Sequence, residues 1–157
     1  RKESIIFCGP VGVGKTHLAE ALGHQACRQG YSVLFTKASR LLSDLGGGRA
    51  DDTWDKRLRR YLKPDLLIID DFALKELTKT QAEDLYELID RRYRSSSMVV
   101  TANRSPKDWY PLFPNPVIAE SALDRLISCS HVITLTGKSY RALLRPDKDL
   151  AKEVVNM

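Results

Sequence analysis

The sequence is poor in the residues that would point to a disulfide-linked, metal-binding or membrane protein. It holds only three cysteines, Cys8, Cys27 and Cys129, and no two of them are spaced as C-x-x-C. This small, odd number argues against a disulfide framework and fits a reducing cytosol. The three histidines lack the spacing of a metal site, and no apolar run is long enough to span a membrane. The N-terminus does not resemble a signal peptide.

The chain also lacks an initiator methionine, internal repeats and low-complexity segments. It opens with Arg1-Lys2-Glu3-Ser4, so we expect an N-terminal region to be missing. What is present is typical of one globular domain: 157 residues, of which 43% are hydrophobic and 29% charged. The net charge of +5 is compatible with nucleic-acid binding without being diagnostic of it.

Short apolar runs alternate with segments that are long enough to be helices. The runs cover residues 5–8, 32–36, 66–69, 98–101 and 131–135. Continuous apolar runs of this length, separated by helical segments, are typical of parallel strands that are buried on both faces. The sequence therefore predicts an α/β fold with a five-stranded parallel sheet and helices on both of its faces.

Two of the intervening segments have helical periodicity. In residues 78–94 apolar side chains recur on one face, and Thr80 with Glu83 matches a capping box. In residues 54–63 the same spacing would turn a set of basic side chains outward: Lys56, Arg57, Arg59, Arg60 and Lys63. Glycines at positions 46–48 predict a mobile loop, and four prolines within residues 106–116 predict an irregular connection.

The most informative segment follows the first apolar run. Gly9-Pro10-Val11-Gly12-Val13-Gly14-Lys15-Thr16 matches the phosphate-binding pattern G-x-x-x-x-G-K-[ST], between a strand and the helical residues 17–28. Backbone N–H groups of such a loop cradle phosphates, and the helix N-terminus adds its dipole. Lys15 is then expected to reach the β- and γ-phosphates, and Thr16 to supply a hydroxyl to Mg²⁺. We include His17, at the start of the helix, in this predicted nucleotide site.

The third apolar run ends in two acids, Asp70 and Asp71. Ligands of open α/β sheets bind at the carboxyl ends of the strands, which places Asp70 across from Lys15 and Thr16. The pattern predicts that Asp70 holds Mg²⁺ through water. Asp71 could orient or deprotonate the attacking water, and a role as an N-cap or a solvated acid is the alternative.

Asn103 follows the fourth run, in T-A-N-R, where its side chain could bridge the γ-phosphate and water. The alternative is that this asparagine only starts a turn. Further on, Arg125 lies in L-D-R-L-I and Arg141 in G-K-S-Y-R. In isolation neither arginine would indicate more than a surface ion pair, for Arg125 with Asp124 or Glu120.

Together, G-P-V-G-V-G-K-T-H-L-A, L-L-I-I-D-D-F, T-A-N-R, L-D-R-L-I and G-K-S-Y-R resemble an AAA+ ATPase of the IstB/DnaC type. The resemblance runs from Ile5 to about Arg145 and is closest to IstB proteins, the helper ATPases of bacterial insertion-sequence transposition. The double acid, in place of Asp-Glu, is a mark of this subgroup. The resemblance implies a bacterial cytoplasmic protein with an AAA+ ATPase core over residues 1–146, a tail over residues 147–157 and no C-terminal lid domain.

The resemblance also implies roles for single residues and for partners. Arg125 would be an arginine finger acting on ATP in a neighbouring subunit, Arg141 would be the sensor 2 residue, and Asn103 would be sensor 1. ATP and Mg²⁺ are the implied cofactors. The implied partners are duplex DNA, further copies of the chain and a transposase, which such proteins usually contact through an N-terminal domain expected to be absent here.

Candidate DNA-binding residues are basic side chains near the second run, the glycines and the basic helical segment: Lys37, Arg40, Arg49, Lys56, Arg57, Arg59 and Arg60. Such side chains hold phosphates without reading sequence, and a solvated helix face is the alternative. Other functions stay open at this point. The chain could load a replicative helicase, as DnaC-type proteins do, or be a nucleotide-gated DNA-binding scaffold with negligible turnover. A small-molecule P-loop kinase is disfavoured because the sequence lacks an arginine-rich lid segment.

Overall fold

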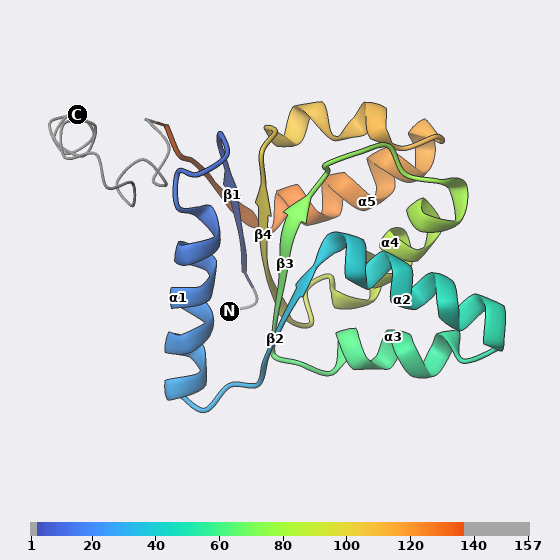
Figure 1. Ribbon diagram of the computed structural model, residues 1–157, viewed down its shortest axis with the longest axis horizontal. Coiled ribbons are helices and arrows are strands. Elements are labelled where there is room, and N and C mark those ends of the chain that lie inside the picture. The colour runs from blue at the N-terminus through green and yellow to red at the C-terminus, as the bar shows by residue number, and fades with distance from the viewer. Residues whose placement is uncertain (1–2, 137–157) are drawn as a thin grey trace, which may run out of the picture.

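A computed structural model describes residues 3–136 of the chain. Its centre is a five-stranded sheet in the order β2-β3-β4-β1-β5, with every pairing parallel (Figure 1). The strands are β1 (Ser4–Cys8), β2 (Val33–Lys37), β3 (Leu66–Phe72), β4 (Ser97–Ala102) and β5 (Ser130–Thr134). Each predicted apolar run overlaps one of these strands, which confirms the expected α/β fold.

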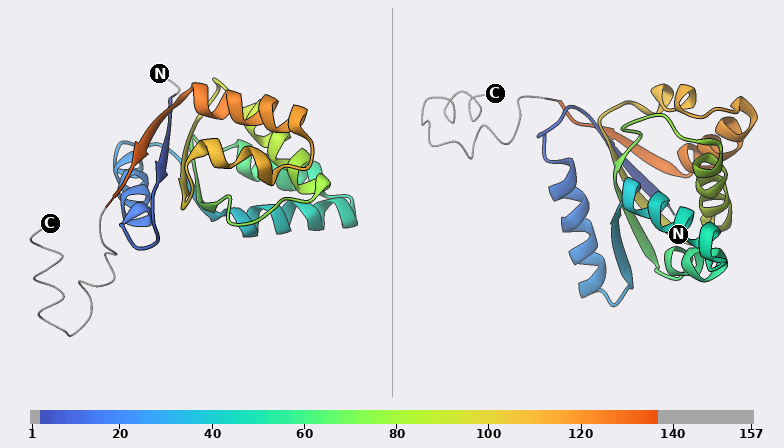
Figure 2. Two further views of the ribbon diagram at one scale, coloured as in Figure 1. Left: turned by 90° about the horizontal axis from the view of Figure 1, so that it is seen from above. Right: turned by 45° about the vertical axis from the view of Figure 1, so that its right-hand side comes forward.

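Helices cover both faces of the sheet, but unequally (Figures 1 and 2). On one face α1 (Lys15–Arg28) packs Ala19 against a small cluster that includes Phe7 and Val99. The other face carries α2 (Ala38–Asp51), α3 (Trp54–Leu62), α4 (Lys79–Arg92) and α5 (Pro116–Ser128). Most of the core lies beneath these four helices. None of the helices in the described part of the chain is long and apolar enough to cross a membrane.

The proline-rich connection between β4 and α5 is compact rather than loose. It contains two short 3-10 helices, η1 (Pro106–Asp108) and η2 (Tyr110–Leu112). Between them Trp109 is fully buried, with its ring edge-on to Phe72 at a centroid distance of 4.7 Å. Its indole N–H donates to the carbonyl oxygen of Arg104 at 3.0 Å, so the connection closes one end of the core.

The predicted helix at residues 78–94 is α4, but the predicted capping box is wrong. Thr78 is the N-cap: its hydroxyl accepts from the N–H of Gln81 at 3.2 Å, and the side chain of Gln81 accepts from the N–H of Thr78 at 3.0 Å. Thr-x-x-Gln fits the capping pattern as well as the Thr80 and Glu83 pair does. The register that forms is the earlier one, which starts the helix at Lys79.

The predicted mobile loop at positions 46–48 is also wrong, because these glycines lie inside α2. Their small size lets α3 approach closely. A Cβ on Gly48 would lie 2.8 Å from the Cα of Trp54, and one on Gly47 would lie 2.9 Å from Nη1 of Arg57. Glycine has a low intrinsic helix propensity, and here the packing of two helices overrides it.

This packing makes a testable difference between two neighbouring glycines. We expect Gly48→Ala to lower the free energy of unfolding by about 1–3 kcal/mol, because the methyl group overpacks the α2–α3 contact. The matched control is Gly46→Ala, whose Cβ would meet no atom within 4 Å. It should raise the free energy of unfolding by up to about 1 kcal/mol through helix propensity. Urea unfolding measures both, and equal stability of the two variants would contradict the close approach.

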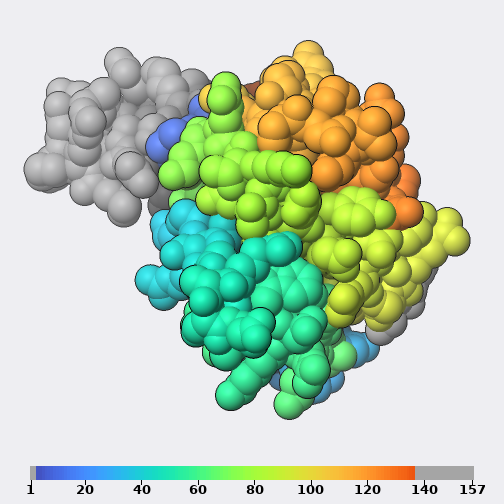
Figure 3. Space-filling model, turned by 90° about the vertical axis from the view of Figure 1, so that its right-hand side faces the viewer, coloured from blue at the N-terminus to red at the C-terminus, as the bar shows by residue number. Residues whose placement is uncertain are grey.

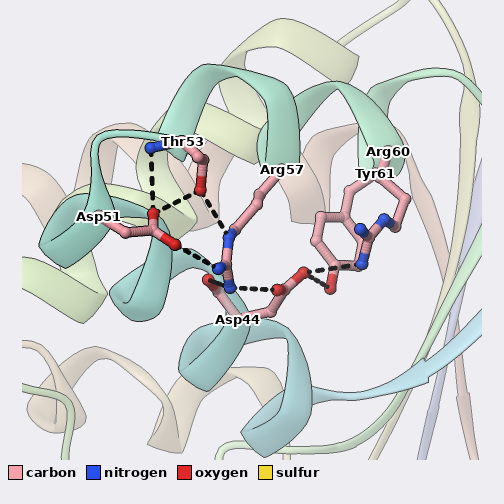
Figure 4. Close-up of polar contacts among 6 residues, drawn as sticks. All are labelled: Asp44, Asp51, Thr53, Arg57, Arg60 and Tyr61. Atoms are coloured by element: carbon pink, nitrogen blue, oxygen red, sulfur yellow. Dashed lines mark hydrogen bonds and ion pairs between the residues drawn. The ribbon is translucent and has the colours of Figure 1, made fainter.

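Polar contacts hold α2, α3 and α4 together. Asp84 of α4 is fully buried and accepts hydrogen bonds from Nε of Arg49 at 2.8 Å and from Nε1 of Trp54 at 2.9 Å. Arg57 of α3 donates to the Asp44 carboxylate of α2 at 2.9 Å (Figure 4). The predicted helix at residues 54–63 is therefore confirmed as α3, but Arg57 does not turn freely outward as expected.

Candidate nucleotide-binding site

Residues 9–16 form the loop between β1 and α1, at the carboxyl ends of the strands. Gly14 is the N-cap of α1 and has a left-handed backbone with φ of 93°, which a side chain would strain. Gly9 is needed for another reason, since a Cβ there would collide with the carbonyl oxygen of Leu135 just after β5. The first N–H groups of α1 have no partner within the helix and carry its positive dipole end. The loop therefore has the backbone of an anion-binding site.

Lys15 is held inside this loop. Its side chain is buried, and the ammonium group donates to the carbonyl oxygens of Gly9 and Pro10, each at 2.7 Å. Burial lowers the pKa of Lys15, while the nearby charges of Asp71 and Asp70 act in the opposite direction. A phosphate oxygen would be a stronger, charge-assisted acceptor than either carbonyl group.

Asp70 lies near the end of β3 and faces α1 across the sheet edge. It is buried, and its Oδ1 accepts a hydrogen bond from the hydroxyl of Thr16 at 3.0 Å. This contact brings together the two segments that the sequence predicts to hold Mg²⁺. A hydroxyl and a carboxylate are hard oxygen donors of the kind Mg²⁺ prefers, so the donor set fits the ion.

Asp71 and Asn103 lie beside this pair. Asp71 has a left-handed backbone with φ of 56°, a conformation that aspartate tolerates better than most residues. It caps no helix, and its carboxylate pairs with the ammonium group of Lys37, the last residue of β2, at 3.2 Å. Asn103 follows the end of β4.

These side chains line one cleft of about 510 Å³, whose residues are Val11, Gly12, Gly14, Lys15, Thr16, His17, Glu20, Phe35, Lys37, Asp70, Asp71 and Asn103. Sequence reasoning did not place Glu20, Phe35 or Lys37 here. The topology could have identified Lys37, because it ends a strand at the same edge of the sheet. No sequence pattern singled out Glu20 or Phe35.

Arg125 lies toward the opposite end of the strands from this cleft. It borders a small hollow together with Ser4, the first residue of β1, whereas the cleft lies where β1 ends. Its guanidinium donates to the Asp90 carboxylate and to the Tyr86 hydroxyl. The Tyr86 contact and the charge of Asp90 raise the pKa of Arg125, although burial opposes them. The alternative considered from sequence, an ion pair with Asp124 or Glu120, does not form, because Arg125 pairs with Asp90 of α4.

Other predicted residues lie elsewhere. Arg141 falls outside the described residues. The candidate DNA-binding residues Arg49 and Arg57 are engaged with carboxylates inside the α2–α3–α4 unit, and Lys37 is engaged in the cleft. Arg60 contacts Asp44 yet remains 62% exposed (Figure 4). The remaining candidates are exposed, and their side chains make no hydrogen bond or ion pair within residues 3–136: Arg40, Lys56 and Arg59. Figure 3 shows the face of the molecule on which the α2–α3 region, in teal, forms the lower part of the surface.

Comparison with known proteins shows the family of the chain. A profile of the family described as IstB-like ATP binding protein matches residues 1–147. The chain belongs to the IstB-like family. It is 56% identical over 147 residues to an insertion-sequence ATP-binding protein of Mycobacterium tuberculosis, covering 93% of this chain and 59% of that protein. It is 38% identical over 141 residues to the ATP-binding protein of insertion sequence IS5376 from Geobacillus stearothermophilus, covering 90% of this chain and 56% of the relative.

Solved structures show the same fold for this IstB-like chain. AMPPCP-bound DnaA from Aquifex aeolicus matches with a TM-score of 0.76 at 18% identity, over 99% of this chain and 51% of that one. The DnaC helicase loader matches with a TM-score of 0.75 at 23% identity, over 85% of this chain and 78% of that one. These likenesses confirm the α/β fold predicted from sequence. The chain spans less than two thirds of the length of its two insertion-sequence relatives.

Proposed function

We propose that this IstB-like chain binds and hydrolyses ATP with Mg²⁺, assembles on duplex DNA and regulates a transposase during insertion-sequence transposition in the bacterial cytoplasm. The hydrogen bond between Thr16 and Asp70 carries the proposal, because it joins the phosphate loop and the strand acid in one cleft. The insertion-sequence relatives, which come from bacteria, support the link to transposition.

In the binding step, the loop amides and Lys15 hold the β- and γ-phosphates. Lys15 exchanges the carbonyl oxygens of Gly9 and Pro10 for phosphate oxygens. Thr16 and Asp70 would hold Mg²⁺, which supplies neutralisation of phosphate charge. Because Asp70 is buried, its carboxylate is held in place before the nucleotide arrives.

In the hydrolysis step, Asp71 and Asn103 act on the attacking water. Asp71 accepts its proton or orients it, and Asn103 positions it against the γ-phosphate. The ion pair with Lys37 engages one oxygen of the Asp71 carboxylate, Oδ2, at 3.2 Å. Arg125 acts on the ATP of a neighbouring subunit, and Arg141 is the sensor 2 residue, so turnover depends on assembly.

The proposed DNA surface is the exposed basic side of α2 and α3. Arg40 and Arg60 border an open groove that also includes Ser39 and Ser43, whose hydroxyl groups can donate to phosphate oxygens. Lys56 and Arg59 are three positions apart and share one face of α3. Arg49 and Arg57 contribute indirectly, since the Arg57–Asp44 pair joins α3 to α2 and the Arg49–Asp84 pair joins α2 to α4.

Removing two of these charges should weaken DNA binding in a defined way. We expect the double variant Lys56→Ala/Arg59→Ala to bind duplex DNA less tightly, with the slope of log affinity against log salt reduced by about two. Fluorescence anisotropy of a labelled duplex across a salt series, with ATP and Mg²⁺ present, measures both quantities. ATP affinity should not change, because neither residue lines the cleft.

The matched control removes two exposed lysines near the start of α4, in Lys75→Ala/Lys79→Ala. It changes the net charge equally and should keep the parental salt slope. Equal slopes for the two double variants would contradict the α2–α3 surface. Binding only in the presence of a replicative helicase would instead favour the loader function, and ATP-dependent binding without phosphate release would favour the scaffold.

A further inference from the structure

One buried hydroxyl contacts both acids of the site. Thr101 lies in β4, next to β3, and is completely buried. Its Oγ1 donates to Oδ1 of Asp70 at 2.5 Å and accepts from the backbone N–H of Asp71 at 3.0 Å. A threonine hydroxyl has one hydrogen to donate, so Thr101 donates it to the Asp70 carboxylate. A lone pair of the same oxygen accepts the backbone N–H of Asp71.

The contact with Asp71 occurs where the sheet is irregular. Ile69 pairs with Val100 and Phe72 pairs with Ala102, so Asp70 and Asp71 together lie opposite Thr101 alone. Two residues facing one is the pattern of a β-bulge, which leaves the extra residue without a regular ladder partner. The Thr101 side chain takes the N–H of that extra residue. It thereby stabilises the left-handed backbone of Asp71, whose φ is 56°.

The contact with Asp70 fixes the other acid from the interior. Oδ1 of Asp70 receives the Thr101 hydroxyl from the sheet and the Thr16 hydroxyl from the cleft, at 2.5 and 3.0 Å. With both donors in place the carboxylate has little freedom to rotate. The orientation of Asp70 and the turn at Asp71 therefore depend on the same buried hydroxyl group.

We propose that Thr101 is a positioning residue for ATP hydrolysis, which sets Asp70 for Mg²⁺ and turns Asp71 into the cleft. This rests on the proposed ATPase function. Thr101 does not line the cleft, so it acts through the two acids and touches neither nucleotide nor water. A purely structural role, in which Thr101 only fills space in a central strand, makes different predictions for its two closest substitutions.

Thr101→Val keeps the shape and removes the hydroxyl, whereas Thr101→Ser keeps the hydroxyl and removes a methyl group. Mg²⁺ should increase the ATP affinity of the parent chain. We expect this increase to be about 10- to 100-fold smaller in the valine variant, and kcat to fall by a similar factor. Titration calorimetry with and without Mg²⁺ measures the first. The serine variant should remain within a few-fold of the parent although it melts at a lower temperature, because it leaves a cavity.

A readout without ligand separates this proposal from the proposed function. Amide hydrogen exchange at Asp71 should accelerate about tenfold or more in Thr101→Val and stay near the parental rate in Thr101→Ser, since only the former loses the acceptor. That measurement decides whether Thr101 holds the turn at Asp71 even if the chain hydrolyses no ATP, an outcome that would contradict the proposed function alone. Parental exchange and parental Mg²⁺ dependence in the valine variant would overturn the proposal. Equal losses in both variants would overturn it too, because packing would then be the cause.

Discussion

Lys15→Ala is expected to bind ATP at least tenfold more weakly than the parent chain. The ammonium group of Lys15 is the one cation within hydrogen-bonding distance of the loop carbonyls of Gly9 and Pro10 among the described residues. Each charge-assisted hydrogen bond to a phosphate contributes about 1.5–3 kcal/mol, and about 1.4 kcal/mol corresponds to a tenfold change in affinity. Titration calorimetry with ATP and Mg²⁺ measures the loss directly.

Two comparisons make this result specific. Lys79→Ala removes an exposed lysine outside the cleft and should leave ATP affinity unchanged. Asp71→Asn should also bind ATP like the parent but hydrolyse it more slowly, because it removes the candidate base and retains Asp70. ATP with Mg²⁺ should raise the melting temperature of both comparison variants but not that of Lys15→Ala. Unchanged affinity in Lys15→Ala would mean that the nucleotide binds elsewhere.

Arg125→Ala is expected to bind ATP normally and to lose most of its assembly-dependent hydrolysis. An arginine finger contributes a factor on the order of 10³–10⁵ to kcat. Arg125 lies toward the opposite end of the strands from the cleft of its own chain, so the proposed finger role requires it to act on a neighbouring copy. Mixing Arg125→Ala with Lys15→Ala should therefore restore part of the activity, because the intact Arg125 of one variant completes the intact loop of the other. Steady-state phosphate release over a range of mixing ratios measures the recovery.

The ion pair of Arg125 with Asp90 supplies the control for a structural role. Asp90→Asn breaks that pair and leaves Tyr86 as a partner of the guanidinium, so it should retain hydrolysis if Arg125 is a finger. If the pair itself is what matters, Asp90→Asn and Arg125→Ala should be equally impaired. Arg91→Ala, which removes a neighbouring exposed arginine of α4, should behave like the parent. Absence of any recovery in mixtures that are shown to co-assemble on DNA would argue against action between subunits.

The parts of the fold that could be predicted from sequence are those with local signals. The strands that pair parallel to one another are continuous apolar runs, and the loop at residues 9–16 carries its glycines and lysine at fixed spacing. Ligands of such sheets bind at the carboxyl ends of the strands, and this rule predicted that Asp70 and Thr16 lie together. The two residues are 54 positions apart in sequence, and Oγ1 of Thr16 is 3.0 Å from Oδ1 of Asp70. Local pattern and sheet topology were sufficient for this part of the site.

The parts that sequence did not predict depend on contacts between distant residues. From sequence, Gly48 is predicted to lie in a loop, whereas in the structure it lies in α2 and packs against Trp54 of α3. Arg125 pairs with Asp90 of α4 rather than with an acid nearby in sequence. Thr101 looks like an ordinary β-branched strand residue. Its proposed positioning role depends on a bulge in β3 that no residue pattern predicts. Such features follow from tertiary packing, which local propensity does not encode.

Phosphate release by the chain, followed over a range of chain concentrations with and without duplex DNA, tests the central claim most directly. The account predicts that release per chain rises with chain concentration, because the neighbour supplies Arg125, and rises further with duplex DNA, which gathers the copies. It also predicts that Lys15→Ala shows neither effect. Release per chain that is independent of both concentration and DNA would contradict the account, and so would an absence of release in a chain that binds ATP.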